Sequence, residues 1–256
     1  MFEQNRNAHL WLISAANILA GTYTATADVT TAMKTHEIPG ITAFGYDHEL
    51  GVERKGKGQF GKNKPIGLID EYGGIKGNFD AEGVDGENAV LAVVNKIARA
   101  SFVNGHYNKL KEFFLLANIY DDDGVILKSH FCDTCKIDSA PKSIGADAKR
   151  FSFQGITGND FMGKKLRFHV VDGNATPVTA CTFPTTEVPY AWVDEDGATR
   201  YALLVLKYKD TDKSHKRFEL AAVAAAGYYS ETVSAVTLHA DNGLAANDKL
   251  VVVYLV

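Results

Sequence analysis

The chain has 256 residues, 46% of them hydrophobic and 23% charged, which is typical of a globular protein that can bury a large core without disulfides. The formal net charge of −4 gives no reason to expect nucleic-acid binding through phosphate neutralisation, and no apolar run approaches the length of a membrane span. Three cysteines are too few for a disulfide framework, so we expect synthesis in a reducing cytoplasm.

The first apolar segment, residues 8–20, could be mistaken for the core of a secretory signal. Glu3 precedes it, and His9 and Asn17 interrupt it, which argues against that reading. We therefore expect a buried strand or helix at this position.

A basic, glycine-rich segment follows, in which residues 56–61 spell a dinucleotide-binding fingerprint and nearly spell a P-loop. Both sites need a helix immediately afterwards to hold phosphate, but Asn63 stands where Ser or Thr should hold magnesium and Pro65 opposes a helix. We expect no nucleotide site and no cofactor. The segment reads instead as an exposed hairpin loop that presents Arg54, Lys55, Lys57, Lys62 and Lys64.

One amphipathic helix is predicted at residues 87–102. Val90, Val94 and Ile97 recur at helical spacing, while Lys96 and Arg99 occupy the other face. This helix would lie across a sheet.

The rest of the chain is predicted to be mainly β, as a sandwich or barrel, because short β-branched and aromatic runs alternate with turn signals. Candidate strands are residues 113–120, 125–137, 166–171, 201–208, 230–239 and 250–255. Candidate hairpin tips are residues 121–124, 172–174, 194–197 and 242–243. Residues 217–226 fit a helix or a strand equally well.

Cys132 and Cys135, beside His130, have the spacing of a metal or redox pair. A structural zinc site needs four ligands, and the other candidates, His169 and Cys181, are isolated in the sequence. If residues 125–137 form a regular strand, Cys135 lies on the face of Phe131 and Ile137 while Cys132 points the opposite way. We therefore expect buried free thiols and no metal site.

No catalytic constellation is visible either. The acidic clusters at residues 121–124 and 194–197 lack the spacing of a calcium loop, and no HExxH or nucleophile-elbow spelling occurs. We expect a protein that is not an enzyme.

A weak boundary near residues 158–165 divides the chain into residues 1–160 and residues 161–256. The second part is a separate β domain or a continuation of the first.

A family resemblance rests on short motifs in a fixed order. They are residues 65–67, residues 77–83, the helical segment, residues 121–124, Leu127, residues 135–137 and residues 151–156. In that order they resemble the tail tube protein family of tailed bacteriophages and related injection machines, from about residue 38 to residue 156. The resemblance implies a tail-tube-like β-sandwich or barrel with one packed helix. The C-terminal portion is expected from its size and its predicted strands, and not from the resemblance, to be a further β-sandwich or to complete the first sheet.

The resemblance also implies a virion structural protein. Its subunits would pair sheet edges into rings, as hexamers, and stack into a channel for genome delivery, with the basic loop touching the neighbouring ring. Implied partners are other copies, together with tape-measure, sheath or tail-terminator proteins. DNA would pass without specific binding, and the protein would reside in the virion tail after assembly in the host cytoplasm, without contact to a membrane.

Two features depart from the family pattern. Residues 85–87 turn early towards the helix, and the C-terminal strands have no obvious family counterpart.

The alternative function is a non-polymerising virion β-sandwich, for capsid decoration or for surface or glycan binding. Its candidate contact residues are Tyr190, Trp192, Tyr228 and Tyr229.

Overall fold

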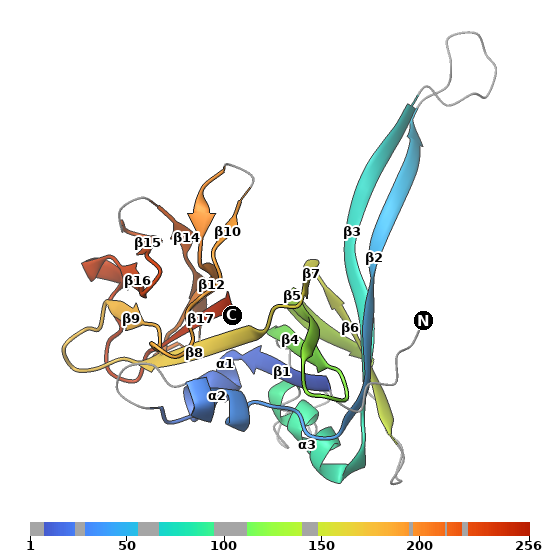
Figure 1. Ribbon diagram of the computed structural model, residues 1–256, viewed down its shortest axis with the longest axis horizontal. Helices are drawn as coiled ribbons and strands as arrows, with labels where there is room; N and C mark the ends of the chain where they lie inside the picture. Colours follow the sequence, from blue (N-terminus) through green and yellow to red (C-terminus); the bar gives the residue numbers. More distant parts are fainter. Residues whose placement is uncertain are drawn as a thin grey trace, which may run out of the picture.

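The computed structural model describes residues 8–23, 29–55, 67–94, 112–139, 148–194, 197–212, 214–221 and 225–256. Over these residues the protein is mainly β, as predicted, with most strands paired antiparallel (Figure 1).

The largest sheet is built from the first part of the chain. Its strand order is β1 (Ala8–Ser14), β4 (Phe113–Tyr120), β5 (Ile126–Ser139), β6 (Lys149–Gly155), β3 (Gly67–Ala81) and β2 (Ile41–Lys55), with β7 (Thr157–Met162) paired to β5. The predicted strands at 113–120 and 125–137 are thereby confirmed as β4 and β5. The predicted turn between them is confirmed too, since the Gly124 N–H donates to the Asp121 carbonyl at 3.1 Å and Gly124 has φ +78°.

The C-terminal part of the chain forms two further four-stranded sheets. One has the order β13 (His215–Arg217), β12 (Ala202–Tyr208), β17 (Lys249–Leu255) and β8 (Leu166–Asp172). The other has the order β14 (Glu219–Leu220), β15 (Tyr228–Glu231), β16 (Ala235–Leu238) and β9 (Ala180–Thr182). The strands predicted at 166–171, 201–208 and 250–255 are confirmed as β8, β12 and β17. On either side of the predicted tip at 194–197, of which residues 194 and 197 are described, β10 (Trp192–Val193) and β11 (Thr199–Arg200) pair as a small hairpin.

Three hydrophobic cores alternate with the β layers. Along β1, Leu10 and Leu12 belong to the core that β3, β6 and a helix share, whereas Trp11 and Ile13 belong to the core against the β8–β12–β17 sheet. The other face of that sheet packs on the β9–β15–β16 sheet through a third core. Because β1 and β4 are buried on both faces, their sequences are continuous apolar runs.

The middle core joins the two halves of the chain. Trp11 and Phe114 pack there with Phe168, Leu206 and Val251, which come from beyond residue 160. The suggested division at residue 160 stays a prediction, and this shared core gives its two parts a large common surface.

The helices are α1 (Ala15–Ala20), α2 (Val29–Thr35) and α3 (Gly83–Val94) in the described part of the chain. The apolar segment at 8–20 forms β1 and then α1, which begins after Ser14 because the Ser14 side chain accepts the Asn17 N–H at 3.4 Å. Both elements lie in the core, as expected. Neither α1 nor α2 was predicted as a separate helix, so the expectation of one packed helix was incomplete.

Helix α3 corresponds to the predicted amphipathic helix but starts earlier, at Gly83 and not at Glu87. Gly83 takes a left-handed φ of +80° at the turn, and Asp85 in the first turn suits the positive end of the helix dipole. Residues 95–102 of the predicted helix lie outside the described residues. Val90 is fully buried and packs in the first core, as predicted.

Two predicted hairpin tips were wrong. Asp172 is the last residue of β8, which pairs with the distant β17, and the N–H of the next residue, Gly173, donates to the Asp248 carbonyl at 2.8 Å. Residues 242–243 instead end the short 3-10 helix η1 (Ala240–Asn242). Gly and Asn mark a chain reversal in both places, but reversal alone does not decide which strands pair.

Two other C-terminal segments also differ from the sequence reading. The single strand expected at 230–239 is two strands, β15 and β16, because Thr232 closes a tight turn between them by accepting the Ala235 N–H at 3.2 Å. In the segment 217–226, where helix and strand stayed open, the described residues include the end of β13 and all of β14.

The cysteine pair corrects the prediction of a regular strand. Opposite Phe113 and Leu115, strand β5 carries one extra residue between Cys135 and Cys132, which is a β-bulge, and Thr134 has φ +46°. The bulge brings both cysteines and Ile137 into one core, while Phe131 faces the other. Both thiols are buried and free, as expected.

We expect replacement of Val90 with Asp to destabilise the protein by at least about 3 kcal/mol, since the change loses burial of an apolar side chain and buries an unpaired carboxylate. Asn88→Asp, at an exposed position of the same helix, should change the free energy of unfolding by less than about 0.5 kcal/mol. Urea unfolding of the two variants measures the difference. Equal midpoints would contradict the packing of α3 on the sheet.

Candidate assembly interface

A long β-hairpin dominates the outline of the molecule. Strands β2 and β3 pair from Ile41 opposite Ala81 to Lys55 opposite Gly67. Strand β6 accompanies β3 only from Ile75 to Ala81, so the far half of the hairpin extends beyond the sheet with no third strand among the described residues (Figure 1). Gly67 and residues 77–81 therefore belong to one long strand, β3, and not to a short strand, while Gly83 begins α3 and residues 65 and 66 lie outside the described residues.

Gly73 and Gly74 mark the point where the hairpin leaves the body. Between His48 and Leu50, β3 carries one extra residue opposite β2, which is a second β-bulge. Gly74 has φ +94°, and a Cβ atom there would lie 2.6 Å from the Gly155 carbonyl oxygen. Only glycine fits this approach, and a bulge bends and twists its strand, which redirects the hairpin.

Open sheet edges are the second feature of this part of the molecule. Strand β2 ends the strand order of the large sheet, and within the described part of the chain its outer edge has no strand partner. Strand β7 likewise pairs with β5 on one side only. A long unpaired edge offers backbone N–H and C=O groups to another chain.

Side chains hold the base of β2 against β7. The Tyr46 hydroxyl donates to Asp160, which also contacts His130 Nδ1 at 2.7 Å. Burial raises the pKa of Asp160, but the hydrogen bonds from Tyr46 and His130 outweigh it and hold this pKa below its ordinary value. Gly158 lies beneath the Tyr46 ring, where a Cβ would come within 2.4 Å. The base of the hairpin is thus fixed to the sheet, and its far half extends beyond the sheet.

The predicted loop residues are placed only in part. Arg54 and Lys55 are the last two residues of β2, at the far end of the hairpin arm. Lys57, Lys62 and Lys64 lie outside the described residues, so the loop assignment stays a prediction. Sequence reasoning missed Tyr46, Asp160 and the bulge. The Gly-Gly pair within a β-rich run was the signal that could have indicated the bulge.

The aromatic residues of the alternative function do not share one environment. Tyr229 is a core residue and Trp192 is half-buried, whereas Tyr190 and Tyr228 are 43% and 41% exposed. Lys164 Nζ lies 3.7 Å from the centre of the Tyr190 ring, a cation–π contact. Of the four candidates, Tyr229 and Trp192 are therefore at least partly packed within the fold.

The three cysteines are buried free thiols, and the buried His169 contacts a tyrosine hydroxyl. Burial raises the pKa of Cys132 well above its ordinary value and that of Cys181 to about 12, which disfavours the reactive thiolate. His169 Nε2 lies 2.6 Å from the Tyr254 hydroxyl. No group of three His, Cys, Asp or Glu side chains in the described ranges could hold a metal ion. No helix in those ranges is long and apolar enough to cross a membrane.

Comparison with known proteins gives structural matches only. No family model matches the chain, and no curated protein matches it. One similar solved structure is the PVC sheath–tube complex of an extracellular contractile injection system in its extended state, at 9% identity and a TM-score of 0.32, over 61% of this chain and 88% of that chain.

Two other solved structures are similar at the same level. The cap that terminates the anti-feeding prophage tube matches at 10% identity and a TM-score of 0.29, over 56% of this chain and 93% of that chain. A type six secretion system protein matches at 10% identity and a TM-score of 0.25, over 82% of this chain and 99% of that chain. The neighbours are thus parts of injection machines, and at these TM-scores the likeness decides nothing about this chain's function.

Proposed function

We propose that the protein is a structural subunit of a phage-tail-like tube that assembles with copies of itself. The observation that carries this proposal is the β2–β3 hairpin, which extends beyond its sheet and presents an edge strand of 15 residues. Soluble proteins usually shorten, charge or cover such an edge, so an edge this long favours pairing with another chain. The ordered resemblance between residues 38 and 156 and tail tube proteins supports the same reading.

In the proposed assembly, subunits pair edges into rings, which the resemblance makes hexameric, and the rings stack into a tube. The hairpin arm carries Arg54, Lys55, Lys57, Lys62 and Lys64 towards the adjacent ring, where the positive charge would favour an acidic surface. Tape-measure, sheath or terminator proteins would bind the finished tube. The subunit would have no catalytic role and would lie in the tail of the particle.

A conducting tube should repel the DNA that passes through it. We therefore expect Asp and Glu to outnumber Lys and Arg on the inner wall, because each cation there would hold a phosphate and slow transit. Electron cryomicroscopy of assembled tubes would locate the wall residues, and a basic lumen would contradict DNA conduction.

The decisive experiment shortens the hairpin at its bulge. Residues 50–72 are replaced by Asn-Gly, which forms a tight turn between strands and keeps the paired base from Ile41 to His48. We expect the wild type to form rings or tubes at high concentration, and the shortened protein to stay a folded monomer. Analytical ultracentrifugation and negative-stain microscopy measure assembly, and circular dichroism checks the fold.

A charge variant tests the role of the hairpin tip. Lys55, Lys57, Lys62 and Lys64 changed together to Ser should weaken assembly at low salt, because charge complementarity speeds and stabilises association. The control changes four lysines outside the hairpin, Lys128, Lys136, Lys209 and Lys216, to Ser, and should assemble like the wild type. A wild type that remains monomeric in all conditions would refute the tube proposal, and binding of such monomers to glycans would favour the alternative function.

A further inference from the structure

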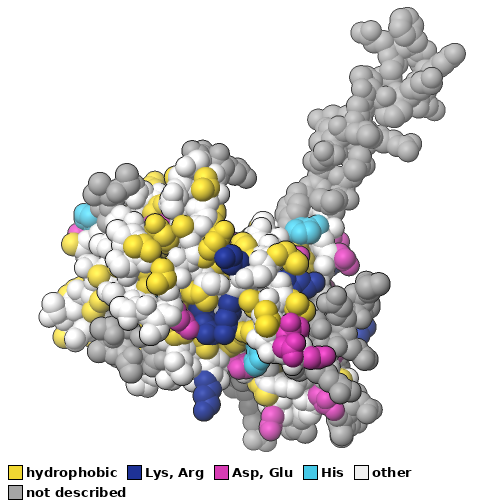
Figure 2. Space-filling view, viewed as in Figure 1, with side chains coloured by type: hydrophobic (Ala, Val, Ile, Leu, Met, Phe, Trp, Pro, Cys, Tyr) yellow, Lys and Arg dark blue, Asp and Glu magenta, His cyan; other side chains and the backbone are white. Residues whose placement is uncertain are grey.

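A cavity of about 620 Å³ opens on the face shown in Figure 2, away from the hairpin arm. Its walls come from β1, α2, the turn between β4 and β5, the start of β8, and Glu187. This volume lies in the range of ligand-binding sites and would accept a few side chains of another molecule. Neither the β2 edge nor the hairpin contributes to it.

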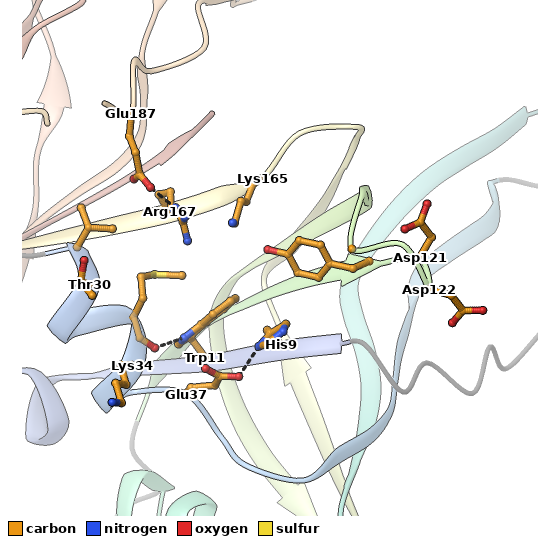
Figure 3. Close-up of a pocket in the computed structure, with 14 residues that line it drawn as sticks. His9, Trp11, Thr30, Lys34, Glu37, Asp121, Asp122, Lys165, Arg167 and Glu187 are labelled. Atoms are coloured by element: carbon orange, nitrogen blue, oxygen red, sulfur yellow. Dashed lines mark hydrogen bonds and ion pairs between the residues drawn. The ribbon is translucent and has the colours of Figure 1, made fainter. Parts of the chain in front are cut away.

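Most of the acidic side chains in the cavity already have partners within the protein. Glu187 pairs with Arg167 at 2.9 Å and accepts the Tyr254 hydroxyl at 3.2 Å. Glu37 contacts His9 across the floor (Figure 3). Asp121 accepts the Val125 N–H at 2.7 Å and so closes its own turn. Asp122, exposed at the rim, has neither a hydrogen bond nor an ion pair with any residue that the structure describes.

The basic side chains are gathered on the opposite wall. Lys165 and Arg167 are two residues apart at the start of β8, so they share a face, and both point towards His9 and Trp11 (Figure 3). Lys165 has no carboxylate partner within hydrogen-bonding distance among the described residues. Burial, and then the neighbouring Arg167 charge, lower the pKa of Lys165. The Glu187 carboxylate, paired with Arg167, offsets this only in part, and a ligand carboxylate beside Lys165 would favour its charged form.

The two ends of the cavity therefore differ in charge. Figure 3 shows Lys165 and Arg167 on one side and Asp121 and Asp122 on the other. The whole lining holds four carboxylates and three Lys or Arg side chains, so a polyanion such as a phosphate would meet net repulsion. A ligand with one negative and one positive group matches both ends.

We propose that this cavity is a binding site for a peptide segment of a partner protein that carries an acidic and a basic side chain close together. The acidic side chain would lie against Lys165, and the basic side chain would lie against Asp122. A charge-assisted hydrogen bond from Lys165 Nζ would hold the carboxylate, while Arg167 stays paired with Glu187.

The test uses the whole subunit at a concentration where it is monomeric, so its result does not depend on tube formation. The probe is the blocked dipeptide acetyl-Glu-Lys-amide, with acetyl-Gln-Lys-amide, acetyl-Glu-Gln-amide and inorganic phosphate as comparisons. Binding is followed by amide NMR shifts. We expect saturable shifts at Lys165, Arg167 and Asp122 in the millimolar range, with each neutralised dipeptide binding at least about tenfold more weakly.

Two variants separate the site from general charge effects. Lys165→Gln should weaken binding of the dipeptide about tenfold or more, because it removes the cation that holds the carboxylate, whereas Lys216→Gln, on an exposed strand, should leave binding unchanged. Equal affinities for both variants would overturn the proposal. So would the absence of saturable shifts for the Glu-Lys dipeptide, or tighter binding of inorganic phosphate than of the dipeptide.

Discussion

Replacing Asp248 with Ala is expected to destabilise the protein by about 3–5 kcal/mol, because it leaves the ammonium group of Lys207 buried without its counter-ion. The two side chains are only 9% and 8% exposed, and Lys207 Nζ lies 3.1 Å from the Asp248 carboxylate. The same carboxylate accepts the backbone N–H groups of Asp210 at 3.2 Å and Ala245 at 3.3 Å. Its loss would therefore also remove an acceptor from two loop N–H groups, one after β12 and one before β17.

A matched control is available at the surface. Arg150 and Asp80 form a bidentate pair, but the Arg150 side chain is 56% exposed, so Asp80→Ala should cost no more than about 1 kcal/mol. Urea unfolding followed by fluorescence gives both free energies. A loss below about 1 kcal/mol for Asp248→Ala would show that the buried pair is not important to the C-terminal sandwich.

The second large effect is a loss of stability in mild acid, which we assign to His36. This side chain is 4% exposed, its Nε2 atom contacts the Tyr23 hydroxyl, and burial lowers its pKa to about 4. In the unfolded chain a histidine takes up its proton near pH 6.5. The unfolded state therefore binds more protons between these values, and stability should fall by about 3 kcal/mol as the pH drops from 6.5 to 4.

Replacing His36 with Gln should remove most of this pH dependence, whatever the substitution does to stability at neutral pH. His239→Gln, at a partly exposed position, serves as the control and should keep the wild-type slope. Asp160 does not interfere with this measurement. Because its pKa is lowered in the folded protein, its contribution to stability is present above about pH 3.8 and is lost only in stronger acid. An unchanged slope in His36→Gln would assign the acid sensitivity to another group.

Much of the strand pattern could be read from local chemistry. Apolar runs bounded by Gly, Asn and Asp located β4, β5, β8, β12 and β17, because strand propensity and turn geometry depend on neighbouring residues. The helical spacing of Val90 and the residues after it located α3 for the same reason. A buried, N-terminal apolar segment followed from its composition.

The sequence did not reveal features that depend on distant contacts. The faces of Cys132 and Cys135 depend on a bulge opposite β4, and the position of the hairpin arm depends on Gly74 meeting the carbonyl of Gly155. Residues 172–174 and 242–243 looked like hairpin tips because turn residues report a reversal, not a pairing partner. The cavity also escaped notice, since His9, Asp122 and Lys165 meet only when β1, the β4–β5 turn and β8 pack together.

By itself, then, the sequence determined a mainly β protein with an amphipathic helix and a basic, glycine-rich segment, because these depend on short-range periodicity and composition. Only the tertiary structure decided that β2 and β3 form a projecting hairpin, that β2 is an open edge, and that β8 pairs with β17. Those outcomes depend on which buried surfaces match across long stretches of chain. No local pattern encodes that match.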